Sequence, residues 1–139
     1  METTASITAP CIFPVIRFAN AARMLDWLGE AFGFSVLTKS MDGARVGHAE
    51  LALGSSIVMC GDHKDDAFGA MTGKPGTPSG WSLYVAVTDI ETLFKRAEAA
   101  GAEILQGLTD RDYGSREFIC RDPEGNVWSF GTYWPKAVA

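Results

Sequence analysis

The chain carries two copies of one helix pattern, 68 residues apart. The stretch AARMLDWLGEAF follows Asn20, a good N-cap residue, and stops at Gly33. A second amphipathic stretch opens with a capping box, Thr88 and Glu91, and stops at Gly101. Because the start, the apolar periodicity and the end all coincide at this offset, the sequence predicts an internal duplication.

Each helix is preceded by one strand-like run and followed by three, so both halves have the order β-α-β-β-β. One such half exposes a curved sheet with too little core behind it, and two halves must therefore combine. The predicted fold class is α+β, with two βαβββ modules whose curved mixed sheets enclose a concave ligand cavity. We expect one domain over residues 1–139, with modules at about 7–62 and 81–135.

Residues 61–80 connect the two modules in this prediction. Five glycines and two prolines break any periodicity there, and the segment is longer than most connections. Its role is predicted to be a plain linker, a lid or a partner contact. The mixed charges of DHKDD, residues 62–66, are typical of a solvated face, and a loosely bound cation is the alternative.

Composition narrows the range of partners. A formal net charge of −5 argues against nucleic-acid binding, which depends on Lys and Arg, and favours neutral or cationic partners. No leader-like start and no run of 18 apolar residues is present, so we expect a cytoplasmic protein without a membrane partner. Cys11, Cys60 and Cys120 have no metal-site or disulfide spacing and are predicted to be reduced, packed thiols.

Three segments carry a resemblance to a known family: RDPEGN after a strand, GSREF just before it, and the helix MLDWLGEAFGF. Together they resemble the vicinal oxygen chelate superfamily of glyoxalase I, bleomycin-resistance proteins and extradiol dioxygenases. The similarity extends from about Ile7 to Trp134, and the GSREF and RDPEGN pair looks most like the bleomycin-resistance branch. The resemblance implies paired modules, often assembled as a homodimer, with a ligand or a metal held in the concave sheet.

In metal-dependent members of that family, His and Glu ligands come from the first and last strand of each module. The corresponding positions here are Phe13, Met59, Ser82 and Ser129. A thioether, a ring and two neutral hydroxyls are poor ligands for divalent ions, so the sequence predicts no metal and no other cofactor. A divalent metal bound elsewhere remains the alternative.

His48 and Glu50 are two residues apart on a predicted strand and should share its concave face. Such a pair suits proton transfer or attraction of a cationic ligand. The alternative is an ordinary ion pair at the rim of the sheet. The offset of 68 places Arg116 and Phe118 at the equivalent positions of the second module, where a role in holding strand register is equally plausible.

Aromatic side chains are predicted to complete the ligand-binding wall, with core filling as the alternative for each. The full set of predicted ligand-binding residues is Phe13, His48, Glu50, Met59, Ser82, Tyr84, Tyr113, Arg116, Phe118 and Ser129. The predicted function is metal-free binding of a small organic compound by a homodimer. The alternative is a lyase, isomerase or dioxygenase of the same superfamily that uses His48 and Glu50, with or without an atypical metal site.

Overall fold

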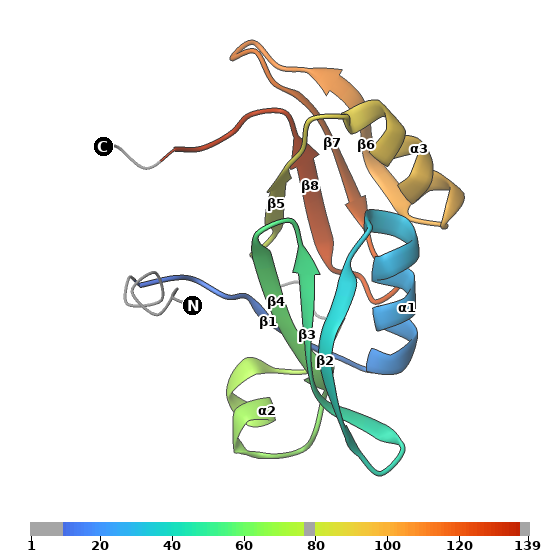
Figure 1. Cartoon of the computed structure of the whole chain (residues 1–139), viewed down its shortest axis with the longest axis vertical. Coiled ribbons are helices and arrows are strands. Elements are labelled where there is room, and N and C mark those ends of the chain that lie inside the picture. The colour runs from blue at the N-terminus through green and yellow to red at the C-terminus, as the bar shows by residue number, and fades with distance from the viewer. Residues whose placement is uncertain (1–9, 77–79, 137–139) are drawn as a thin grey trace, which may run out of the picture.

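The computed structural model describes residues 10–76 and 80–136, and it contains the two predicted modules (Figure 1). The predicted start of the first module, at about residue 7, lies outside the described residues. The first module comprises β1 (Val15–Phe18), α1 (Ala21–Phe32), β2 (Ser35–Asp42), β3 (Arg45–Leu53) and β4 (Ser56–Asp62). The second comprises β5 (Leu83–Ala86), α3 (Ile90–Ala99), β6 (Glu103–Asp110), β7 (Arg116–Arg121) and β8 (Val127–Gly131).

The two sheets have the same topology. Their strand orders are β1-β4-β3-β2 and β5-β8-β7-β6, and in each sheet the first strand runs parallel to the last while the other pairs are antiparallel. Both sheets are therefore mixed, as the sequence predicts. The helices α1 and α3 lie on one side of the molecule and leave the other face of each sheet open (Figure 1).

Local capping explains where α1 begins and ends. The Asn20 side chain accepts a hydrogen bond from the Arg23 N–H, and Gly33 takes a left-handed conformation at φ 88°. The predicted capping box of the second helix is wrong by one residue. Asp89 is the N-cap of α3, where its carboxylate accepts from the N–H and the hydroxyl of Thr92.

One hydrophobic core runs through both modules. Phe32, from α1, packs against Trp128 and Phe130 of β8, with ring centroids 5.1 and 4.7 Å away. Trp128 and Phe130 were predicted to face the helices, and both are buried. The two modules of one chain are thus joined by aromatic packing rather than by a flexible linker alone.

Side chains of the second module also cap both ends of α1. The Glu124 carboxylate accepts hydrogen bonds from the N–H groups of Ala19 and Asn20, at 2.6 and 2.8 Å. At the other end, Arg96 donates to the carbonyls of Gly29 and Glu30, at 2.8 and 2.7 Å. An anion at the N-terminus and a cation at the C-terminus both complement the helix dipole, so each stabilises the contact between the modules.

Two of the cysteines agree with the prediction, while Cys11 and Asp62 differ from it. Cys60 and Cys120 are buried as predicted, and burial raises their thiol pKa to about 11 and about 12. Cys11 is exposed, contrary to the prediction of a packed thiol. Asp62 is buried rather than solvated, because its carboxylate accepts from the N–H groups of Ala21 and Val46.

The connector contains one short helix, α2 (Ala67–Thr72), which the broken periodicity of the sequence did not predict. Asp66 is its N-cap and accepts from the Gly69 N–H at 2.7 Å. No helix in residues 10–76 and 80–136 combines the length and the apolar character that crossing a bilayer requires.

Candidate functional site

The open faces of the two sheets are the candidate site, and the strand registers place their residues. In the first sheet, Met59 of β4 lies between Val15 of β1 and Glu50 of β3. In the second sheet, Ser129 of β8 lies between Tyr84 of β5 and Ile119 of β7. Since Cys60 and Trp128, the neighbours of Met59 and Ser129, are buried toward the helices, these two rows point to the open side.

Two predicted site residues lie just before the strands. Phe13 precedes β1 and Ser82 precedes β5, and both are exposed or half-exposed. The residues that pair with Met59 and Ser129 are Val15 and Tyr84 instead. At the centre of the first open face the Met59 thioether therefore lies beside the Val15 isopropyl group. At the centre of the second, the Ser129 hydroxyl lies beside the Tyr84 phenol.

These central residues do not fit the divalent metal of the superfamily's metalloenzymes. Neither Val15 nor Met59 offers imidazole nitrogen or carboxylate oxygen, and Ser129 and Tyr84 offer only neutral hydroxyls. Among the described residues, no three His, Cys, Asp or Glu side chains lie close enough together to hold an ion. The four central residues are therefore poor ligands for such an ion.

His48 and Glu50 share the open face of β3, as predicted from their spacing. His48 Nε2 lies 3.0 Å from Glu50 Oε2, with side chains 48% and 35% exposed. The neighbouring Ala49 and Leu51 point into the core. The pair can exchange a proton with a bound compound or present a carboxylate to a cation, and it also has the geometry of a simple ion pair.

A hollow of about 220 Å³ lies on the open face of the first sheet. It is lined by Val15, Arg17, Gly47, His48, Met59, Cys60, Gly61 and Phe68. Gly61 forms part of its floor, and a Cβ there would lie 2.7 Å from the Gly47 carbonyl oxygen. The absence of a side chain at Gly61 therefore lets β3 and β4 approach closely.

Arg116 and Phe118 do not lie on the open face, contrary to the prediction. Phe118 is buried, stacks on Phe130 at 5.0 Å and packs edge-on against Phe94 of α3. Arg116 points to the same side, where it pairs with Asp110 at 3.0 Å and with Glu91 of α3 at 3.5 Å. Both are structural residues, so the alternative reading of Arg116 as a register-holding residue fits the structure better.

One extra residue in the second module explains this error. Ser35 pairs with Ala52, 17 residues later, whereas Glu103 pairs with Arg121, 18 residues later. The offset between modules is therefore 69 at β7 rather than 68. A shift of one residue on a strand moves every side chain to the other face.

Glu117 takes the open-face position that the sequence assigned to its neighbours. Its side chain is 12% exposed and accepts hydrogen bonds from the Tyr113 hydroxyl at 2.8 Å and from Arg111 Nε at 3.2 Å. Burial raises the pKa of Glu117, but hydrogen bonds from Tyr113, Ser115 and Arg111 outweigh it and hold the pKa below its usual value. An ionised carboxylate therefore lies on this face.

The tyrosines of the second module surround that carboxylate. Tyr84 donates to the Tyr133 carbonyl at 2.7 Å, and the rings of Tyr113 and Tyr133 meet edge-on at 6.1 Å. Burial, followed by smaller effects that include the charge of Glu117, raises the pKa of Tyr84. Tyr84 and Tyr113 thus join the open face as predicted, whereas Glu117 and Tyr133 were missed because only the correct register identifies them.

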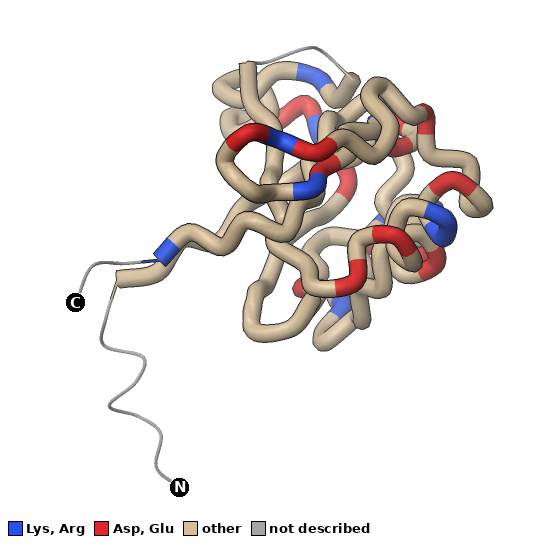
Figure 2. The backbone as a smooth tube through the Cα atoms, turned by 90° about the horizontal axis from the view of Figure 1, so that it is seen from above, with Lys and Arg blue, Asp and Glu red and all other residues tan. Residues whose placement is uncertain are grey.

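Charges elsewhere are dispersed. Acidic and basic positions are interspersed along the described chain in Figure 2, without a continuous basic stretch. The described segments nearest the two termini leave on the same side, away from α1 and α3 (Figures 1 and 2). Exposed apolar side chains occur in these segments and just before β5, namely Ile12, Trp81, Tyr133 and Trp134, and others lie on β2.

Known proteins share this architecture. The chain is 31% identical over 136 residues to the uncharacterized protein MT0910 of Mycobacterium tuberculosis, covering 94% of this chain and 78% of that one. The crystal structure of TioX from Micromonospora sp. ML1 superposes with a TM-score of 0.72 at 30% identity, covering 94% of this chain and 98% of TioX. Glyoxalase I from Zea mays shares the fold at 17% identity, with a TM-score of 0.69, over 86% of this chain and 43% of the maize chain.

A family model matches residues 12–130 of this chain, which include every helix and nearly every strand residue of both modules. The duplicated topology and the mixed sheets agree with that match. The chain belongs to the Glyoxalase/Bleomycin resistance protein/Dioxygenase superfamily.

Proposed function

We propose that this protein binds a small organic molecule on the open faces of its sheets, without a metal ion, and that planar cationic aromatic compounds are the favoured class. The observation that carries this proposal is the pairing of Met59 with Val15 and of Ser129 with Tyr84 at the centres of those faces. These residues offer apolar contact and hydroxyl groups where a metal would need imidazole or carboxylate.

Charge supports a cationic ligand. The chain has a formal net charge of −5, which raises the local concentration of cations near the protein. On the first open face Glu50 supplies a half-exposed carboxylate, and on the second the rings of Tyr84 and Tyr113 offer cation–π contacts. Such contacts contribute about 0.5–2 kcal/mol each.

The binding unit in this proposal is a homodimer. Ile12, Trp81 and Trp134 are 94%, 81% and 55% exposed, and a second copy would remove this apolar surface from water. We place the protein in the cytoplasm, where Cys60 and Cys120 stay reduced. The biological role in this proposal is sequestration of a drug, and with it antibiotic resistance of the bleomycin type, which is one of the three functions that the family description names.

Calorimetric titration of chelator-treated protein tests the proposal, with bleomycin first and then a panel of planar cationic aromatic compounds. We expect saturable binding that chelator treatment leaves unchanged. The variant Met59→Lys should abolish binding of cations by charge repulsion at the centre of the first face, while the neutral control Met59→Gln should retain it. Lack of saturable binding across the panel would sink the proposal, and a stoichiometric metal whose removal abolishes binding would sink its metal-free part.

The 3.0 Å contact between His48 and Glu50 favours a second candidate function, a metal-free enzyme of this superfamily. In that case His48 would transfer a proton to or from the bound compound. Mass spectrometry of the compound recovered from the wild-type protein and from His48→Ala distinguishes the two functions. A chemical change that depends on His48 would establish the enzyme, and recovery of the unchanged compound from both proteins would establish binding alone.

A further inference from the structure

The short helix α2 is mostly exposed, with Gly69 as its one buried residue, and it reaches the open face of the first sheet through Phe68. Its Phe68 lines the same hollow as Val15 and Met59, which belong to that face. In Figure 1, α2 lies on the side of the first sheet away from α1. The connector therefore supplies a wall to the candidate site.

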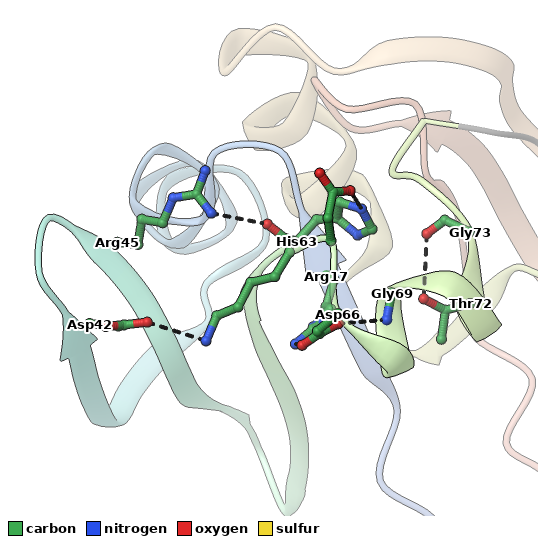
Figure 3. A network of polar contacts seen from close by, with 10 residues as sticks. Arg17, Asp42, Arg45, His63, Asp66, Gly69, Thr72 and Gly73 are labelled. Atoms are coloured by element: carbon green, nitrogen blue, oxygen red, sulfur yellow. Dashed lines mark hydrogen bonds and ion pairs between the residues drawn. The ribbon is translucent and has the colours of Figure 1, made fainter.

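Arg17 holds this wall in place. Its guanidinium makes a two-pronged ion pair with Asp66, with N–O distances of 3.0 and 3.1 Å, and lies 5.0 Å from the centre of the Phe68 ring. Figure 3 shows Arg17 reaching Asp66, which also accepts from the Gly69 N–H at the start of α2. One side chain of β1 thus fixes both the beginning of α2 and the orientation of Phe68.

The size and chemistry of the hollow suit a single ring. Its volume is about 220 Å³ and it is partly open to solvent, so a bound ring would contact the sheet on one face and Phe68 at its edge. Val15, Met59 and Phe68 form apolar walls, and thioether and aromatic groups both make favourable contacts with a ring. Arg17 is paired with Asp66, and the carboxylate of Glu50, which pairs in register with Met59, lies next to the hollow beside His48.

We propose that this hollow is a subsite for one aromatic ring that carries a cationic substituent, and that Phe68 is the residue that selects the ring. The inference rests on the proposed function and gives it a location and a specificity determinant. Arg17 and Asp66 act as positioning residues, because they hold Phe68 and are not required to touch the ligand.

Benzamidine, a single ring with a cationic amidine, is the test ligand, and benzoate is the matched anion. Binding is followed by the NMR signal of the Met59 methyl group, identified with Met59→Leu. In the wild-type protein we expect a saturable shift with benzamidine and a much smaller one with benzoate. Phe68→Ala should weaken benzamidine binding about tenfold, the loss of one aromatic contact of roughly 1.4 kcal/mol.

Met71→Ala is the matched control, because Met71 is on the same helix, is 81% exposed and does not line the hollow. It should change the affinity less than twofold. Asp66→Asn should weaken binding without abolishing it, since Phe68 is then less well oriented. Thermal unfolding of each variant checks that the fold is retained, which the exposure of Phe68 and Met71 makes the expected result.

Equal effects of Phe68→Ala and Met71→Ala, a preference for benzoate, or no shift of the Met59 signal in the wild-type protein would each overturn this inference. None of these results decides the proposed function, which stands or falls on saturable binding of the larger compounds. If those compounds bind while benzamidine does not reach Met59, the ligand site is elsewhere on the open faces.

Discussion

The Tyr113 hydroxyl donates a 2.8 Å hydrogen bond to the carboxylate of Glu117, on the open face of the second sheet. Arg111 and Ser115 also donate hydrogen bonds to this carboxylate. The three partners hold the pKa of Glu117 below the ordinary value although burial raises it. The ionised form of Glu117 is therefore favoured in the folded protein, and its stabilising effect depends on pH.

Glu117→Gln should lower the free energy of unfolding near neutral pH by on the order of 1 kcal/mol, because the amide accepts these bonds less strongly than the carboxylate. The pKa is lowered on folding, so the contribution is complete above the ordinary carboxyl pKa of 4.5 and is lost as the pH falls through the folded-state value. Urea unfolding at several pH values measures it. A difference between wild type and variant that stays constant in acid would contradict the assignment, and exposed Glu98→Gln is the control.

Arg96→Ala should destabilise the protein by about 1 kcal/mol, because the carbonyls of Gly29 and Glu30 lose their donors. Lys95→Ala, one residue earlier on the exposed part of α3, should have little effect. Chemical denaturation of both variants gives the comparison. If the two were equally stable, Arg96 would contribute nothing to the contact between the modules.

Gly131→Ala should displace Tyr84. A Cβ at position 131 would lie 2.5 Å from the Tyr84 hydroxyl and 2.7 Å from Glu117 Cγ, so we expect a loss of about 1–3 kcal/mol from overpacking. Gly107→Ala is a matched control, because a Cβ there meets nothing within 4 Å. Removing the ring with Tyr84→Ala should restore part of the loss in the double variant, and strictly additive effects would contradict this steric origin.

Trp81→Ser should shift the protein from dimer to monomer if a second copy covers the exposed apolar side chains. Light scattering coupled to gel filtration measures the mass. Leu37→Ser is the control, since Leu37 is 54% exposed on β2, an edge strand of the first sheet. A monomeric wild-type protein, or dissociation by Leu37→Ser alone, would refute the proposed dimer surface.

Most of the fold could be predicted from local signals. Asn20 and Gly33 mark the ends of α1 because a side-chain cap and a left-handed glycine satisfy backbone groups that the helix itself leaves free. The alternation of residues along β5 and β8 correctly predicted which side chains enter the core. Leu83 and Trp128 point toward the helices, and Tyr84 and Ser129 point to the open face. These signals lie within a few residues of the structure they determine.

The rest of the site depends on pairing between distant segments, which no local pattern records. The register of β6 against β7 decides that Glu117 rather than Phe118 reaches the open face. The helix α2 was missed because its six residues are too few for a periodicity and include Gly69. Its place beside the sheet comes from Arg17 and Asp66, which are 49 residues apart.

The hold of Glu124 and Arg96 on opposite ends of α1 makes the two halves of this duplicated chain depend on each other. A fragment ending at Asp62 would leave the amides of Ala19 and Asn20 without their acceptor and would turn the ring of Phe32 out to water. A single module on its own would have to take these partners from a second copy. This chain supplies them within one polypeptide, so we expect neither half to keep its structure without the other.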